Sequence, residues 1–283
     1  MVSHYREAGS SRDGRWAVDI DASSAGWEFS GIRVLLLGAD EGEVFDTGDC
    51  EYILVPFEGS FEVVVDGVAS TLFGRHSVFE GPTDVLYVPR DSRVEVHSTD
   101  GGRLAMPNAR ARRRHPVQYL ASGQVPVALR GAGSMTRMIR DFGGVDTIVA
   151  DRLIACEVIT PGGNWSSYPA HKHDEESETE SQLEEIYYFE VAEGPSGHGV
   201  AYQRAAASDD RSIDVLEEVR SGDVVLIPHG WHGPAMASPG FDLYYLNVMA
   251  GPAEQRSWRI TDEPSTAWIR DTWADLAPDT RLL

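Results

Sequence analysis

Short apolar runs, separated by turn-forming residues, recur along the whole chain of 283 residues. In the first half they occupy 32–38, 51–57, 60–65, 85–88 and 93–96. In the second half they occupy 152–159, 186–191, 200–204, 223–228 and 243–249. No helical period of comparable strength accompanies them, and runs of this length bounded by Gly and Pro predict β-strands. Only the stretch 265–276, near the end of the chain, looks helical.

The two halves share a pattern that suggests a duplicated architecture. Residues 222–228 (GDVVLIP) resemble residues 83–89 (TDVLYVP), because in both an acidic residue leads an apolar strand that stops at proline. This weak internal repeat is compatible with two related β-barrels. Between them lies MPNARARRRHP at 106–116, which we interpret as a solvated connector, with contact to an anionic substrate as the alternative. We therefore predict an all-β chain with domains at 1–115 and 116–283.

Composition narrows the class of partner. Apolar residues make up 42% of the chain, enough for a sizeable core. With 24 Lys and Arg against 45 Asp and Glu, the formal charge of −21 argues against nucleic acid and anionic membrane surfaces. No apolar stretch approaches the length of a membrane span. Cys50 and Cys156 lie far apart, so no disulfide framework is indicated and the cytoplasm is the expected compartment.

The tripeptide His171-Lys172-His173 is the most informative chemical signal. Residues i and i+2 of a strand point to the same face, so both imidazoles can reach one metal ion, although an isolated H-x-H is weak evidence. Downstream, a proline-glycine turn presents His232, with His229 in the same turn as an alternative ligand. Three imidazoles and one carboxylate would suit Zn²⁺, Mn²⁺ or Fe²⁺.

Strand parity selects the carboxylate. Glu184 and Glu185 open the next strand, and Glu185 shares a face with Tyr187, Phe189 and Val191. That face is the more apolar one, as the interior of a barrel should be, so we favour Glu185 over Glu184 as the ligand. A slip of one residue in register would reverse the choice.

Several neighbouring residues are weaker candidates. Tyr187 would lie beside Glu185 and could act as an acid or bind substrate, although a core aromatic is an equal alternative. Lys172 is a second catalytic candidate, but it should point to the opposite strand face. The acidic stretch 174–182 is expected to tie the ligand strands together, with a mobile lid as the alternative. Arg137, Arg152 and Glu157 are further candidates for carboxylate binding or base chemistry, each with a favoured structural interpretation.

These motifs resemble a known superfamily. The order H-x-H, Glu, G-x₅-P-x-G-x-H is similar to the two metal motifs of the cupins, although the gap from His173 to Glu185 is longer and Gly230 to His232 is one residue shorter than usual. The resemblance implies two cupin-like jelly-roll β-barrels in one chain. The N-terminal half contains no comparable histidine motif. It is therefore expected to lack the metal set and to serve in packing and contacts within a homo-oligomer.

Longer stretches narrow the resemblance. GNWSSYPAHKHD at 163–174, LEEIYYF at 183–189 and LYYLNVMAGP at 243–252 are similar to the 5-deoxy-glucuronate isomerases of bacterial myo-inositol catabolism, and EYILVPFEGSFEV and LYVPRDSRVEV extend the match into the first half. This implies an intramolecular oxidoreductase that interconverts an aldose and a ketose, 5-deoxy-glucuronate and 5-dehydro-2-deoxygluconate, with a divalent metal. The related 4-deoxy-5-keto-uronate isomerases look more distant.

Two other functions fit the same residues. An Fe²⁺ dioxygenase can use three histidines and a glutamate. A non-enzymatic cupin that binds a sugar acid is the second alternative, although a sensor of that kind would be expected to carry a basic DNA-binding segment, which the sequence does not show. The sequence leaves open the native metal, the residue that moves the proton, and whether a hydride shift replaces proton transfer.

Overall fold

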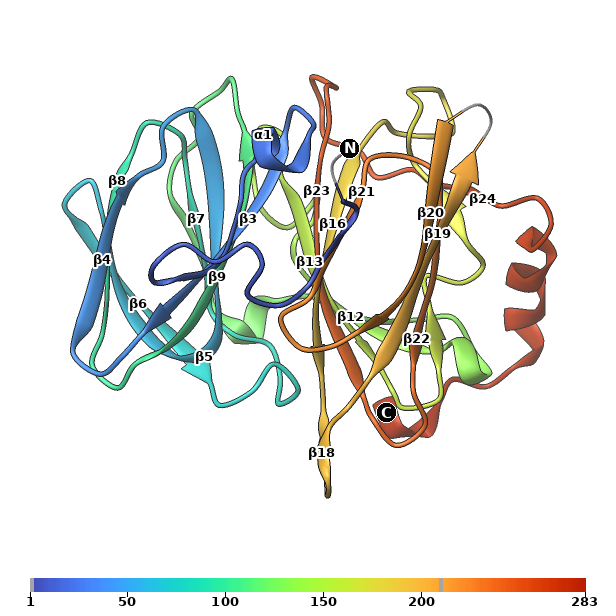
Figure 1. Cartoon of the computed structure of the whole chain (residues 1–283). Helices are drawn as coiled ribbons and strands as arrows, with labels where there is room; N and C mark the ends of the chain where they lie inside the picture. Colours follow the sequence, from blue (N-terminus) through green and yellow to red (C-terminus); the bar gives the residue numbers. More distant parts are fainter. Residues whose placement is uncertain (1–2, 209–210) are drawn as a thin grey trace.

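The computed structural model describes residues 3–208 and 211–283, which fold into two β-barrels side by side (Figure 1). The N-terminal barrel contains one sheet of nine strands, all paired antiparallel. Its strands are β2 (Trp16–Ile20), β3 (Ser30–Leu37), β4 (Glu41–Asp46), β5 (Cys50–Val65), β6 (Val68–Arg75), β7 (Val85–Val88), β8 (Arg93–Ser98), β9 (Gly102–Arg110) and β10 (Gln118–Leu120). The helix α1 (Ala22–Ala25) is capped by Asp21.

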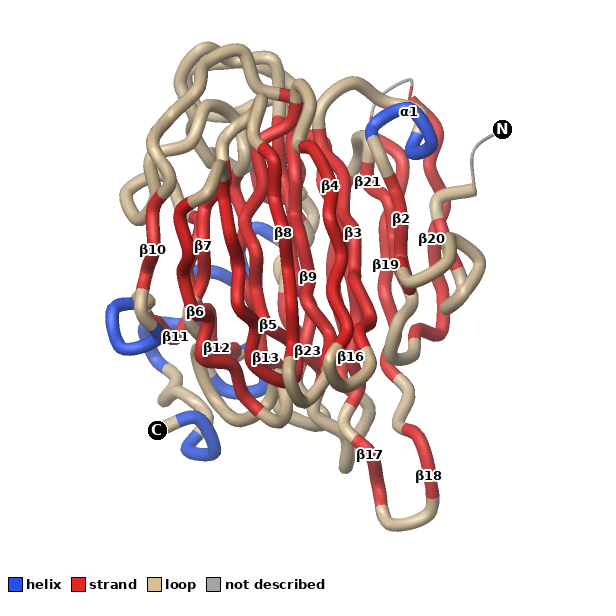
Figure 2. Tube along the Cα trace, turned by 90° about the vertical axis from the view of Figure 1, so that its left-hand side faces the viewer, coloured by secondary structure: helices blue, strands red, loops and turns tan. Residues whose placement is uncertain are grey.

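The C-terminal barrel is built from two sheets that enclose one core. The first runs β1 (Tyr5–Arg6), β21 (Val224–Ile227), β16 (Glu184–Val191), β23 (Leu243–Ala250), β13 (Ile154–Thr160), β12 (Arg137–Gly143) and β11 (Val127–Arg130). The second runs β20 (Arg211–Val219), β19 (Ala201–Ser208), β22 (Trp231–Ala237), β15 (His171–Lys172) and β24 (Thr261–Asp262), with β14 (Trp165–Ser166) paired to β22. A small hairpin of β17 (Glu193–Gly194) and β18 (Gly197–His198) projects from one end (Figure 2).

Helical structure is minor (Figure 2). The segment predicted to be helical is a 3₁₀-helix, η3 (Ala267–Asp275), beside the C-terminal barrel, and η1 (Ser122–Gln124), η2 (Gly133–Met135) and η4 (Thr280–Leu282) are single turns. Within the described ranges, no helix is long and apolar enough to cross a membrane. The all-β, two-barrel architecture expected from the cupin resemblance is therefore confirmed.

The sheets that face each other between the barrels are covered on both sides. Strands β13 and β23 are buried at every position, and β7 and β21 likewise. One face of these sheets lines its own barrel, and the other packs into a core shared between the halves that includes Ile53, Phe57, Tyr188, Tyr244 and Leu246. Strands with two buried faces read as continuous apolar runs, which is why the sequence revealed them.

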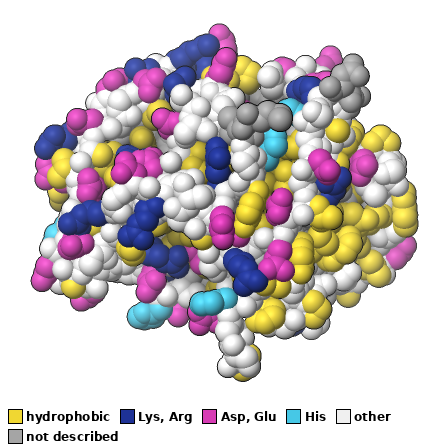
Figure 3. Space-filling model, viewed as in Figure 1, with side chains coloured by type: hydrophobic (Ala, Val, Ile, Leu, Met, Phe, Trp, Pro, Cys, Tyr) yellow, Lys and Arg dark blue, Asp and Glu magenta, His cyan; other side chains and the backbone are white. Residues whose placement is uncertain are grey.

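Some strands with a solvent-exposed outer face were not predicted from the sequence. In β20, buried and exposed positions alternate and the outward residues are mostly polar, and in β4 exposed positions alternate with partly buried ones. Figure 3 shows that hydrophobic side chains gather over the C-terminal barrel in this view, and the outward residues Tyr202 on β19 and Leu216 on β20 are exposed. The amphipathic β4, β6 and β20 have too few apolar residues to stand out against loops.

Two details of the predicted organisation were wrong. Runs 51–57 and 60–65 form the single strand β5, which continues through a register shift between Pro56 and Glu58. The predicted connector begins too early, because Met106–Arg110 belongs to β9, held between β3 and β5. The division at 115/116 stays a prediction. Strand β10 pairs with β7 of the first barrel, whereas β1 pairs with β21 of the second.

Candidate metal centre and adjoining cavity

Three predicted ligands meet inside the C-terminal barrel. His173 follows β15, Glu185 lies on β16 and His232 lies on β22, so both sheets contribute. One ligand atom from each of these three residues, called the metal group below, lies within 4.8 Å of the others. Glu185 Oε2 is 3.1 Å from His173 Nε2 and 3.0 Å from His232 Nε2. All three side chains are at most 2% exposed, so the group is shielded from water.

Backbone carbonyls orient the imidazoles. Nδ1 of His173 faces the Leu183 carbonyl at 3.3 Å, and Nδ1 of His232 faces the Gly230 carbonyl at 3.0 Å. A carbonyl only accepts hydrogen bonds, so each Nδ1 carries the proton and, in the neutral ring, each Nε2 keeps its lone pair. These lone pairs converge on the Glu185 carboxylate, an arrangement that a cation between them would satisfy. A backbone acceptor behind each imidazole is typical of metal-binding histidines.

An unsatisfied atom supports the same conclusion. Among the described residues, Nε2 of His232 is buried and has no hydrogen-bond partner, because its approach to Glu185 lacks hydrogen-bond geometry. Burial alone raises the pKa of Glu185, but the adjacent His232 and His173 outweigh it and hold that pKa well below its usual range. The carboxylate is therefore ionised and ready to bind a cation, and the three residues fit a divalent metal ion.

His171 lies next to this group and not within it. Its ring centroid is 4.6 Å from that of His232 and 6.3 Å from that of His173. Its Nδ1 faces the Pro169 carbonyl at 3.4 Å, which leaves Nε2 as the free nitrogen. Burial, with the neighbouring histidines, lowers the pKa of His171 well below its ordinary value, so the ring stays neutral. His229, the alternative to His232 in the proline-glycine turn, faces the Ser212 carbonyl at 3.4 Å and lies outside the group.

The two adjacent glutamates face opposite ways, as parity predicts. Glu184 leaves the C-terminal barrel and accepts the backbone N–H groups of residues 28–30 at 2.8 to 2.9 Å. The N-terminal half makes a reciprocal contact through Glu51, which accepts hydrogen bonds from the N–H groups of residues 151–153 at 2.6 to 2.8 Å. Each half thus clamps the backbone of the other through one strand carboxylate, and Glu185 alone of the pair faces the histidines.

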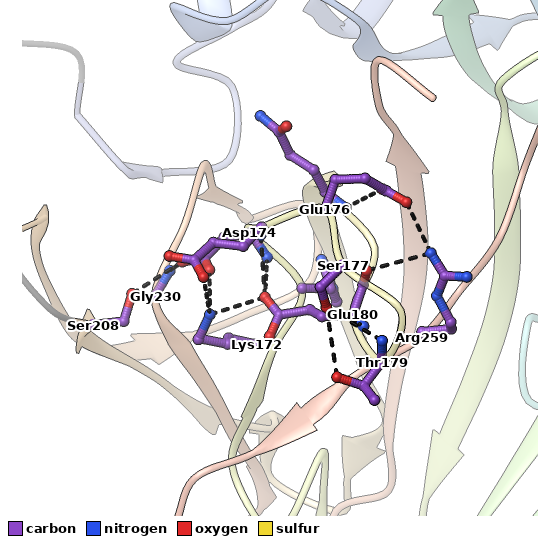
Figure 4. Close-up of polar contacts among 12 residues, drawn as sticks. Lys172, Asp174, Glu176, Ser177, Thr179, Glu180, Ser208, Gly230 and Arg259 are labelled. Atoms are coloured by element: carbon purple, nitrogen blue, oxygen red, sulfur yellow. Dashed lines mark hydrogen bonds and ion pairs between the residues drawn. The ribbon is translucent and has the colours of Figure 1, made fainter. Parts of the chain in front are cut away.

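Lys172 also points away from the metal group. Its ammonium donates to Asp174 at 2.8 Å and to Glu180 at 2.9 Å, in the network of Figure 4. Asp174 in turn accepts the N–H of Gly230, whose carbonyl orients His232. The pairing therefore positions the turn that carries His232. It offers no contact through which Lys172 would reach the reacting atoms, and the catalytic assignment of Lys172 gains no support.

The acidic stretch 174–182 is anchored by the same network. Glu180 is 4% exposed and accepts the N–H groups of Asp174 and Glu175 at 2.9 and 3.1 Å. At its outer side, Glu176 pairs with Arg259 at 2.8 Å (Figure 4). The stretch contributes no residue to the cavity beside the metal group. This arrangement favours the interpretation of a tie between the ligand strands.

A cavity of about 100 Å³ adjoins the metal group. His171 and Glu185 line one part of it, and Tyr187, Tyr245 and Ser167 line another. The Ser167 hydroxyl lies 3.3 Å from the Tyr187 hydroxyl and 3.2 Å from that of Tyr245. Burial raises the pKa of Tyr245 to about 12 and that of Tyr187 well beyond its ordinary range, so both phenols keep their protons at neutral pH.

Sequence reasoning missed Tyr245 and Asn247. Both face the cavity from β23, and the Asn247 amide donates a hydrogen bond to Glu185 Oε1. The signal was present, since residues 245 and 247 share one strand face within the buried run LYYLNVMA, where a single amide stands among apolar residues. Nothing in the local sequence says that this face of β23, rather than the other, lies on the same side of the sheet as Glu185.

The three weaker candidates, Arg137, Arg152 and Glu157, lie in different parts of the structure. Glu157 lies in the interface between the barrels, where it pairs with Arg75 and accepts a hydrogen bond from Tyr244. Arg152 stacks on Phe29 and donates to the Gly251 carbonyl at 2.9 Å. Both therefore have the structural roles that were favoured. Arg137 lines the cavity.

Comparison with known proteins identifies the family. The KduI/IolB family matches residues 4–269. The chain belongs to the KduI/IolB family. It is 38% identical to the 5-deoxy-glucuronate isomerase of Geobacillus kaustophilus over 258 residues, which cover 90% of this chain and 91% of that protein. The family resemblance noted in the sequence is thereby confirmed.

Solved structures agree. An IolB-like protein from Salmonella typhimurium superposes with a TM-score of 0.86 at 34% identity, over 94% of this chain and 99% of that one. Bacillus subtilis oxalate decarboxylase, whose Mn(II) centres have been studied, shares the fold with a TM-score of 0.57 at 12% identity, over 90% of this chain and 74% of that one. The more distant likeness shows the fold alone.

Proposed function

We propose that this protein is a metal-dependent 5-deoxy-glucuronate isomerase, which interconverts 5-deoxy-glucuronate and 5-dehydro-2-deoxygluconate. The observation that carries the proposal is the convergence of His173, Glu185 and His232 beside a cavity, in a chain of the KduI/IolB family. The relative from Geobacillus kaustophilus bears the name of this activity at 38% identity. We further propose a sugar acid as the small-molecule partner, a homo-oligomer, and the cytoplasm as the compartment, which suits two free cysteines.

His173, Glu185 and His232 would hold the divalent cation, with His171 as the proposed fourth ligand through its free Nε2. Zn²⁺, Mn²⁺ and Fe²⁺ all suit this donor set. When bound, the cation supplies Lewis-acid polarisation of a carbonyl and its neighbouring hydroxyl. Asn247 keeps the Glu185 carboxylate in place through its hydrogen bond to Oε1.

The chain's own residues orient the substrate. Tyr187 keeps its proton at neutral pH because burial raises its pKa, so we assign it as a hydrogen-bond donor or general acid toward a substrate oxygen. Ser167 fixes the directions of Tyr187 and Tyr245 by lying between their hydroxyls. The low exposure of His173, Glu185 and His232 keeps bulk water away from the proposed ligands.

The direct test combines metal analysis with an assay of purified protein on 5-deoxy-glucuronate. Turnover without oxygen is expected with bound Zn²⁺ or Mn²⁺, and strict dependence on oxygen would instead identify a dioxygenase. A protein that holds no stoichiometric metal and forms no ketose contradicts the proposal. Running the reaction in D₂O separates the two chemical routes, because proton transfer through a base admits solvent deuterium at carbon and a direct hydride shift does not.

A further inference from the structure

Arg137 is a buried cation without a carboxylate beside it. The residue is 8% exposed, and its Nη1 donates a hydrogen bond to the Met135 carbonyl at 3.3 Å. In the described part of the chain Arg270, which lines the same cavity, is paired with Asp262, whereas Arg137 forms no ion pair. A buried charge is costly unless it is paired, so an unpaired guanidinium in a cavity wall points to an anionic ligand.

The fold aims this cation at the cavity. Arg137 begins β12, and strand parity places it on the same face as Ile139, which also lines the cavity. The other face of β12 carries Arg140, which pairs with Glu157 between the barrels. Arg137 therefore shares the cavity with Glu185 and His171, which belong to the metal end.

Two other arginines line the same cavity but are less suited to bind a ligand. Arg270 is engaged by Asp262 through both Nε and Nη2. Arg130, the cross-strand neighbour of Arg137, is exposed to solvent. Burial, together with these two charges, lowers the pKa of Arg137 to about 10, so it remains protonated at neutral pH. Arg137 is the member of the three that combines burial with free donor groups.

We propose that Arg137 determines specificity by binding the carboxylate of the sugar-acid substrate, while the carbonyl end of the same molecule lies toward His171 and Glu185. The planar guanidinium matches a carboxylate through two parallel hydrogen bonds. The identity of the substrate rests on the proposed function. The preference for a carboxylate over a neutral group rests on the geometry of the cavity.

A purely structural role is the competing explanation. The Arg137 guanidinium lies 5.4 Å from the centroid of Trp273 in η3, and stacking of this kind would hold the C-terminal segment in place. Arg270 lies closer to the same ring, at 4.7 Å. The tryptophan therefore has a second cation to stack on, and its packing does not account for the burial of Arg137.

The experiment measures binding of D-glucuronate and of D-glucuronamide to the metal-loaded protein by calorimetry. The two probes differ only in a carboxylate against a carboxamide. The wild type is expected to prefer glucuronate about 10- to 100-fold, the range of a hydrogen bond to a charged group. Arg137→Met should abolish this preference by weakening glucuronate alone, and Arg137→Lys should restore part of it, since it keeps the charge without the fork.

Control variants separate ligand binding from structure. Trp273→Leu removes the stacking partner but keeps the guanidinium, so the preference should survive. Arg220→Met removes an exposed arginine, which is paired with Glu218 outside the cavity, and should change neither affinity. Metal content and circular dichroism report whether each variant is folded.

Three results would overturn the role of Arg137: equal wild-type affinity for both probes, a preference that survives in Arg137→Met, or a loss in Trp273→Leu as large as that in Arg137→Met. Failure of the proposed function is separate, because it appears as absent turnover of 5-deoxy-glucuronate by the wild type. In the active enzyme, the substitution should raise KM for 5-deoxy-glucuronate more than it lowers kcat.

Discussion

Replacing Glu184 and Glu185 one at a time by glutamine should separate stability from metal binding. Glu184→Gln keeps one acceptor oxygen and places an NH₂ group against backbone donors of residues 28–30, which now meet a carboxylate at 2.8 to 2.9 Å. One N–H group then loses its acceptor, which costs ~1–3 kcal/mol, and the remaining bonds weaken as their acceptor loses its charge. Because Glu184 is only partly buried, water recovers some of this. We expect a net loss of ~2–4 kcal/mol with the metal retained.

Glu185→Gln should have the opposite outcome. The amide keeps the volume and can still accept from Asn247, so stability without metal changes little. Bound metal should fall to below about a tenth of the wild-type content, since an anionic ligand is lost and supporting groups alone change affinity ~10–100-fold. Urea unfolding of metal-free protein and elemental analysis of metal-loaded protein measure the two effects.

Glu62→Gln is the matched control, because Glu62 is an exposed strand residue on β5. It should shift stability by less than about 0.5 kcal/mol. The reasoning is refuted if Glu184→Gln loses the metal, or if its stability changes no more than that of the control. Loss of the metal in Glu184→Gln would mean that the strand register assigned to β16 is wrong, and an unchanged stability would mean that the contacts of Glu184 with residues 28–30 contribute little.

Four further outcomes follow from the same geometry. His232→Ala and His171→Ala should each lower metal content and activity while the far-ultraviolet circular dichroism spectrum stays unchanged; full metal content in both would contradict the site. Removing the metal with a chelator should lower Tm, and adding Mn²⁺ or Zn²⁺ should restore it, because a ligand that binds only the native state stabilises it. Glu51→Gln should destabilise by ~3 kcal/mol in urea, since Glu51 is fully buried and also accepts the Tyr87 hydroxyl at 2.8 Å; a change below ~1 kcal/mol would argue against the clamp. Asp151→Asn should show a stability deficit that depends on pH. Burial raises the pKa of Asp151, but the Arg112 N–H and the Arg113 guanidinium lower that pKa by a larger amount, so the native pKa lies below the unfolded value. Its contribution is present above the unfolded pKa of ~3.9 and is lost as pH falls through the native pKa, so the deficit at pH 7 should shrink on acidification, and a constant deficit would contradict this.

The sequence by itself determined the types of ligand and the strands that carry them. H-x-H, Glu185 and the proline-glycine turn were visible as candidate ligands because metal ligands are few in kind, and parity on β16 separated Glu185 from Glu184 because side chains alternate along a strand. The continuous apolar runs marked β7, β13, β21 and β23, since strands covered on both faces must be apolar throughout.

Tertiary structure decided what lies opposite each strand. Asn247 and Tyr245 joined the site because β23 pairs with β16 in one register, which no local pattern specifies. Lys172, adjacent to two candidate ligands in sequence, points toward Asp174 and Glu180 because of the same alternation. The role proposed for Arg137 depends on its place in the cavity. From the sequence alone an arginine is expected at the surface, and only the fold shows that this one is buried without a charged partner. Strand pairing and burial both depend on contacts between segments that are distant in sequence. Those contacts form only when both barrels close.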